Sequence, residues 1–99
     1  MTEPKAVTVT AQTVAKLARG VRLREDAVRG QNVLLAPERA LALDDIAVMI
    51  VNALDGERSL DAIAEEFSVK FEAPKDQILG DIITFVDEFS KRRMLELKP

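Results

Sequence analysis

The 99-residue sequence contains no cysteine and no histidine. These two absences exclude disulfides, thiolate nucleophiles, imidazole bases and the usual zinc ligands. Catalysis would have to depend on carboxylates, lysines or hydroxyl groups, and no glycine-rich phosphate loop, nucleophile elbow or metal-ligand spacing accompanies them. We therefore assign no catalytic residue, no metal site and no cofactor, and expect that the protein is not an enzyme.

Long apolar runs are also missing from the sequence. None approaches the ~20 residues needed to cross a bilayer, and the N-terminus lacks the apolar segment of a signal peptide. We therefore expect a cytoplasmic protein without membrane contact. The formal net charge of −3 repels a phosphate backbone, which disfavours nucleic acid as a partner.

Large apolar side chains are scarce in the first twenty residues. A short alternation of valine and threonine is followed by a weak helical stretch around residues 14–17. Because termini that do not pack stay loose, residues 1–20 are predicted to be a flexible arm or linker, and residues 21–97 the folded domain.

Apolar residues in alternation predict three short strands. From Val21 they alternate with arginines, and an apolar run at residues 33–35 follows Gly30. Alternation returns at residues 40–43, after Pro37. Gly30 allows the positive φ of a tight connection, and Pro37 favours a turn. The segment is predicted to be a three-stranded antiparallel meander.

Three helices are predicted after these strands. Asp44 and Ser59 are suited to cap the first two helices, and Gly56 to end the first. Pro74 is tolerated in the first turn of the third helix, and the cations at residues 91–93 suit its C-terminal end. The predicted fold class is α+β: a three-stranded antiparallel sheet followed by three helices, similar to a winged helix-turn-helix.

Two elements are candidates for binding. The third helix carries two adjoining apolar stripes, which are either one wide buried arc or a buried stripe beside an open groove. The stripes consist of Ile78, Ile82, Phe85 and Phe89, and beside them Leu79, Ile83 and Val86. The strand at residues 40–43 is the last of the meander, so its edge is either open to strand addition or protected by its shortness. Asp81, next to Ile82, is either a solvated helix carboxylate or a hydrogen-bonding group at the groove rim.

The centre of the sequence contains a specific series of residues. The series is Val21-Arg22-Leu23-Arg24-Glu25-Asp26, Arg29-Gly30, Val33-Leu34-Leu35-Ala36-Pro37-Glu38-Arg39 and Leu43-Asp44. It resembles the PqqD family, whose members share an R-L-x-x-D, R-G and L-L-x-P-E-R pattern at this spacing. The resemblance covers roughly residues 21–95. It departs from the family pattern at Arg93-Met94, where a Gly-Leu ending is more usual.

The resemblance implies a RiPP precursor-peptide recognition element. Such a protein is a non-catalytic peptide chaperone of pyrroloquinoline quinone biosynthesis that binds the precursor peptide PqqA and presents it to the radical-SAM enzyme PqqE. In related recognition elements the peptide lies as an extra strand beside the third strand and packs on the third helix. The peptide-binding residues implied for this chain are Arg39, Ala40, Leu41, Ala42, Leu43, Ile78, Asp81, Ile82, Phe85 and Phe89. The family also occurs fused to neighbouring pathway enzymes, which makes residues 1–20 a candidate remnant of such a junction.

Two alternatives stay open at this point. The fold alone suggests a winged-helix nucleic-acid-binding protein, although Asp81, Asp87 and Glu88 on the third helix suit neither phosphates nor base edges. An exposed sheet edge also allows a homodimer in which two copies pair their edges.

Overall fold

The computed structural model describes residues 9–26, 28, 30–37 and 39–98. Six strands and three helices lie in this part of the chain. In chain order they are β1 (Val14–Leu17), β2 (Arg22–Asp26), β3 (Gln31–Ala36), β4 (Arg39–Leu43), α1 (Asp45–Ala53), β5 (Asp55–Ser59), α2 (Leu60–Phe71), α3 (Lys75–Lys91) and β6 (Leu95–Lys98). None of the helices described is long and apolar enough to span a membrane.

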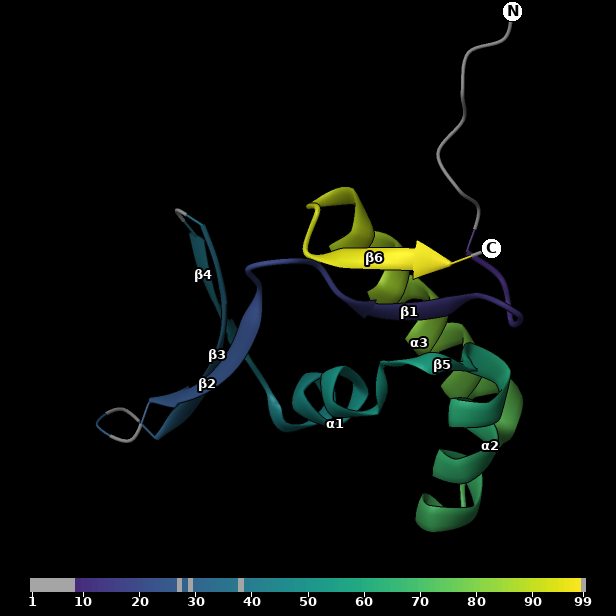
Figure 1. Ribbon diagram of the computed structural model, residues 1–99. Coiled ribbons are helices and arrows are strands. Elements are labelled where there is room, and N and C mark those ends of the chain that lie inside the picture. The colour runs from purple at the N-terminus through teal and green to yellow at the C-terminus, as the bar shows by residue number, and fades with distance from the viewer. Residues whose placement is uncertain (1–8, 27, 29, 38, 99) are drawn as a thin grey trace, which may run out of the picture.

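The strands form two antiparallel three-stranded sheets, in the orders β5-β1-β6 and β2-β3-β4. Figure 1 shows the β2-β3-β4 sheet on one side of the molecule, with α1 between it and the pair α2 and α3. The predicted α+β class and the predicted meander are confirmed. The β5-β1-β6 sheet was not predicted, because β5 has the sequence DGERS and carries no large apolar residue.

The expected weak helix around residues 14–17 is wrong, since this segment is strand β1. It pairs with both β5 and β6, which lie far along the chain. Ala15 is 1% exposed and belongs to the hydrophobic core. The described part of the expected arm is therefore packed at β1, and residues 1–8 lie outside the described residues. A domain boundary after residue 20 stays a prediction.

Side-chain caps begin the first two helices as the sequence predicts. Asp44 Oδ1 accepts a hydrogen bond from the backbone N–H of Ala47 at 2.8 Å, and Ser59 Oγ accepts one from Ala62 at 3.2 Å. Gly56, however, does not end α1. It lies inside β5 with a φ of 79°, where an added Cβ would stand 3.2 Å from Lys16 Cδ. The glycine is used for a close approach to β1.

Two hydrophobic clusters divide the interior. The larger one joins α1, α2 and α3 to the β5-β1-β6 sheet, with Leu60, Ile63 and Ile82 nearly inaccessible to solvent. The smaller one lies under the β2-β3-β4 sheet and contains Val21, Leu34, Val51 and Met94. Helix α1 contributes Ile50 to the first cluster and Val51 to the second. It therefore fixes the β2-β3-β4 sheet relative to α2 and α3.

The turn after α3 gives a testable prediction about backbone conformation. Arg93 has a φ of 64°, in the left-handed region where a residue with a Cβ is disfavoured by roughly 1–2 kcal/mol. Arg93→Gly should raise the free energy of unfolding by about 0.5–1 kcal/mol, since relief of this cost exceeds the added freedom of the unfolded chain. Thermal unfolding measures the change.

The neighbouring residue provides a matched control. Arg92 has a φ of −89°, so Arg92→Gly should lower the stability by up to about 1 kcal/mol. Equal destabilisation by both substitutions would contradict the left-handed conformation of Arg93.

Candidate binding site

Strand β4 lies at the edge of its sheet. It pairs with β3, and no described strand pairs with its other side. The β3–β4 hairpin closes on the pair Ala36 and Arg39. Because backbone groups alternate in direction along an antiparallel strand, those of Leu41 face β3 and those of Ala40 and Ala42 face outward. The edge therefore presents a row of backbone donors and acceptors.

The composition of β4 leaves this edge open. Natural sheets blunt their edges with charged side chains, proline or bulges. The opposite edge, β2, carries such charges at Arg22, Arg24 and Glu25. Strand β4 has a regular register and only alanine and leucine after its first residue. Of the two edges of this sheet, β4 is the one suited to receive another strand.

The two faces of β4 differ in character. Leu41 and Leu43 are half-buried and pack against the smaller cluster. Ala40 and Ala42 are exposed and line a hollow of about 380 Å³ on the outer face of the sheet. Their small side chains leave the approach to the edge unobstructed.

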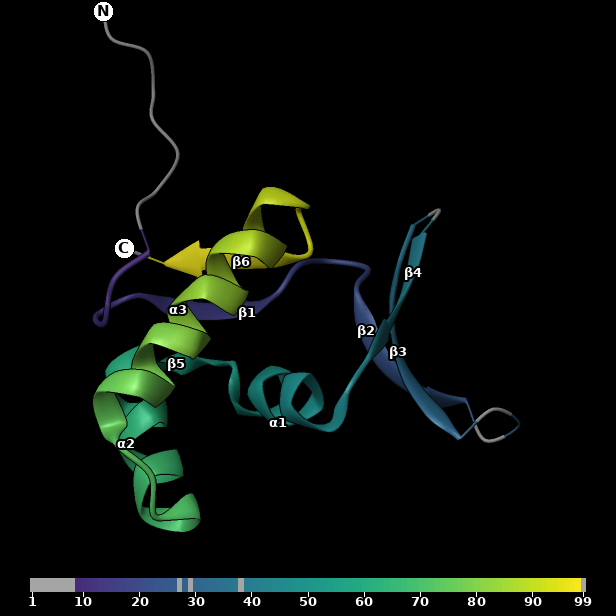
Figure 2. The same ribbon diagram turned by 180° about the vertical axis from the view of Figure 1, so that it is seen from behind.

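The C-terminal half of α3 is tied to the start of β4. Arg39 Nη1 donates to the backbone carbonyl of Arg92 at 3.3 Å. The rings of Phe85 and Phe89 stack with their centroids 4.2 Å apart and pack against the smaller cluster, as Leu41 also does. Figure 2 shows α3 and β4 on the two sides of α1. Phe85 and Phe89 therefore lie on the part of α3 that is joined to β4.

The N-terminal half of α3 borders an open apolar pocket of about 270 Å³. Helix α3 contributes Ile78, Asp81 and Ile82 to its lining. The remaining walls are Gln77, also from α3, Ile46, Met49 and Ile50 from α1, Phe67 and Phe71 from α2, and Ala73. Each of the two predicted stripes contains one buried residue, Ile82 in the first and Val86 in the second, whereas Ile78 is half-buried at the pocket. Which stripe borders an open groove stays a prediction.

The predicted binding residues thus fall into two neighbouring groups. Arg39 to Leu43 lie with Phe85 and Phe89 at the β4 side, and Ile78, Asp81 and Ile82 lie at the pocket. The walls from α1 and α2 were missed, including Ile46 and Phe71, which are 61% and 45% exposed. The feature of the sequence that could have indicated them is a large apolar residue at the end of a helix, outside the stripe that packs into the core.

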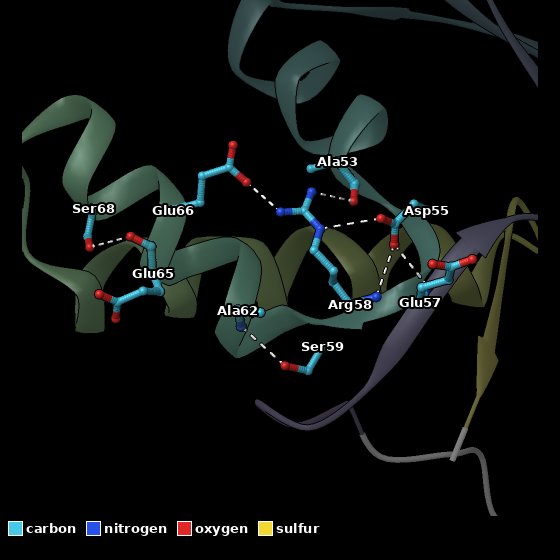
Figure 3. Close-up of polar contacts among 9 residues, drawn as sticks. All are labelled: Ala53, Asp55, Glu57, Arg58, Ser59, Ala62, Glu65, Glu66 and Ser68. Carbon is cyan, nitrogen blue, oxygen red and sulfur yellow. Dashed lines mark hydrogen bonds and ion pairs between the residues drawn. The ribbon is translucent and has the colours of Figure 1, made fainter.

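A polar cluster centred on Arg58 of β5 joins the C-terminal end of α1 to the middle of α2 (Figure 3). The Arg58 guanidinium donates to Glu66 Oε1 at 2.5 Å, to Asp55 Oδ2 at 3.3 Å and to the carbonyl of Ala53 at 3.4 Å. The backbone N–H groups of Arg58 and Glu57 donate to Asp55 Oδ1, and these bonds hold the pKa of Asp55 below its ordinary value. Their contribution to stability is present at neutral pH and is lost as the pH falls from about 4 through the lowered pKa.

Comparison with known proteins identifies the family. Residues 31–95 match the family model described as Coenzyme PQQ synthesis protein D (PqqD). The chain belongs to the PqqD family. The resemblance seen in the sequence is thereby confirmed.

Relatives within the PqqD family extend over nearly the whole chain. The PqqA binding protein of Rhizobium meliloti (strain 1021) is 64% identical over 92 residues, covering 93% of this chain and 94% of that protein. The solution NMR structure of the PqqD truncation of Methylobacterium extorquens PqqCD, described as a functional and stand-alone RiPP recognition element, has a TM-score of 0.78 at 39% identity and covers 89% of this chain and 94% of that one. The crystal structure of PqqD from Xanthomonas campestris has a TM-score of 0.57 at 41% identity, with coverage of 81% and 89%.

The cations at the end of α3 do not give this PqqD-family chain a free basic patch. Lys91 Nζ lies 3.1 Å from Asp87 Oδ2, and Arg92 Nη2 lies 3.5 Å from Glu88 Oε1. These pairs neutralise two of the three cations within the helix itself. The nucleic-acid alternative therefore loses its main electrostatic support.

Loss of Arg58 should destabilise the packing of α1 against α2, the two helices that form walls of the pocket. Arg58→Met removes contacts to three groups on α1, β5 and α2, and we expect it to lower the free energy of unfolding by about 1 kcal/mol. Urea denaturation measures the change. Lys91→Met removes one exposed ion pair within a helix and should cost less than about 0.5 kcal/mol. Equal losses in the two variants would show that Arg58 acts as an ordinary surface charge.

Proposed function

We propose that this chain is a non-catalytic peptide chaperone that binds the precursor peptide PqqA as an added strand beside β4 and presents it to the radical-SAM enzyme PqqE. The observation that carries this proposal is the outward-facing backbone of Ala40 and Ala42, on an edge strand whose Leu41 packs against the same hydrophobic cluster as Phe85 and Phe89 of α3. Relatives named PqqA binding protein, and a similar structure described as a RiPP recognition element, support it.

Backbone pairing alone is too weak to account for binding. Two outward-facing residues offer up to four hydrogen bonds, each with a net value of about 0.5–1.5 kcal/mol. Association costs roughly 4–15 kcal/mol in lost translational and rotational freedom. Pairing with Ala40 and Ala42 therefore sets the register of the bound peptide, called the guest below. Burial of the guest's side chains against α3 must supply most of the affinity.

Strand addition also explains how a small domain presents a substrate. The paired part of the peptide is held extended along β4, which has only five residues. The rest of the guest remains outside the strand pair and accessible to a second protein. The domain needs no catalytic group for this role, because the modifying enzyme supplies the chemistry.

Proline at position 42 tests the strand addition. Ala42→Pro removes an outward N–H donor and keeps the ladder to β3, since an edge strand tolerates proline where its N–H faces away from the sheet. We expect PqqA affinity to fall at least about tenfold, since loss of a donor and the ring in the guest's path act together. Fluorescence anisotropy with labelled PqqA of Rhizobium meliloti measures it.

The opposite edge of the same sheet provides the control. By the same alternation, the backbone of Glu25 faces outward from β2. Glu25→Pro should therefore leave PqqA affinity unchanged. Full affinity in a folded Ala42→Pro protein would contradict strand addition to β4, and an equal loss in Glu25→Pro would contradict the choice of edge.

A further inference from the structure

We infer that the apolar pocket between α1, α2 and α3 is a second contact site for the same peptide, which accepts one large apolar side chain from the part that continues beyond Leu43. The inference rests on the proposed function and extends it to the chemistry of the guest. It assigns binding roles to Ile46 and Phe71, on helices outside the predicted site.

The pocket lies on the path that an added strand would follow. Strand β4 ends at Leu43, and Ile46 follows in the first turn of α1. Consecutive Cα atoms are about 3.8 Å apart, so the Cα atoms of Leu43 and Ile46 are separated by at most about 11 Å. An extended guest advances about 3.3 Å per residue and reaches Ile46 within roughly four residues of its paired segment. Figures 1 and 2 both show α1 between the end of β4 and the pair α2 and α3.

The pocket is suited to a single side chain. Its volume of about 270 Å³ lies just below the roughly 300–1,000 Å³ of small-molecule sites. Apart from Gln77 and Asp81, its walls are aliphatic and aromatic side chains together with Met49, whose flexible thioether adapts to different shapes. Ile46 and Phe71 remain exposed to solvent at its lining, so an apolar guest side chain would remove further apolar surface from water.

The one carboxylate of the lining adds a polar requirement. Asp81 is exposed and makes no ion pair with a described residue, and Gln77 lies one helical turn before it. The carboxylates of Asp61 and Glu65, by contrast, are already occupied by Lys75 Nζ at 3.0 and 3.3 Å. Asp81 is therefore available to a donor or cation of the guest next to its apolar anchor.

Substitutions at the exposed part of the lining test the site with the full chain and with PqqA of Rhizobium meliloti. Ile46→Ser and Phe71→Ser should each weaken binding about tenfold, because each removes apolar surface that the guest buries. Val69→Ser is the matched control, since Val69 is 71% exposed on the same helix as Phe71 and does not line the pocket. It should bind PqqA as the wild type does. Asp81→Asn should lose about threefold at low salt and nothing at 1 M salt.

The outcomes separate this site from strand addition. Wild-type affinity in both Ile46→Ser and Phe71→Ser, with binding still lost in Ala42→Pro, would overturn the pocket site and leave the strand pairing intact. Normal binding by Ala42→Pro would instead contradict the proposed function. A second copy of the chain could instead occupy the pocket, and sedimentation at several concentrations tests this. Self-association that disappears in Ile46→Ser would assign the pocket to the second copy and overturn the inference.

Discussion

The one-sided pairing of β4 is the constraint on which the site depends. A backbone N–H or C=O group that finds no partner within the fold must bond to water or to another chain. In β4 these groups belong to two alanines, whose small side chains neither cover the edge nor repel a guest. The charged residues of β2 protect the other edge of the sheet. Among the described strands, none pairs with this edge of β4, and helix α1 follows β4 directly in the chain.

The surrounding frame keeps that edge and the helices in a fixed relation. Helix α1 shares its residues between the two hydrophobic clusters, and Arg39 joins the start of β4 to the end of α3. Lys75 Nζ at the start of α3 bonds to Asp61 and Glu65 of α2, which raises the pKa of Lys75. A preorganised site loses less conformational entropy on binding, so this rigidity favours affinity without adding contacts.

Periodicity and capping residues predicted the elements whose pattern is contained in their own stretch of sequence. The meander from Val21 to Leu43 and the caps Asp44 and Ser59 are local features, and the structure contains all of them. Strands β1, β5 and β6 are short or polar, and each exists because of partners far along the chain. The same difference between local patterns and long-range packing applies to the residues of the binding site. Residues on β4 and α3 are marked by alternation and stripes, whereas Ile46 and Phe71 become neighbours only when three helices pack together.

Amide hydrogen exchange of the isotope-labelled protein tests the central claim most directly. In the free protein the amides of Ala40 and Ala42 should exchange rapidly, while those of Leu41 and Leu43, directed toward β3, should be slow. Saturation with PqqA should slow the two alanine amides at least about tenfold and change the leucine amides little. Slow exchange of both alanine amides before the peptide is added, or unchanged rapid exchange after it, would contradict the account.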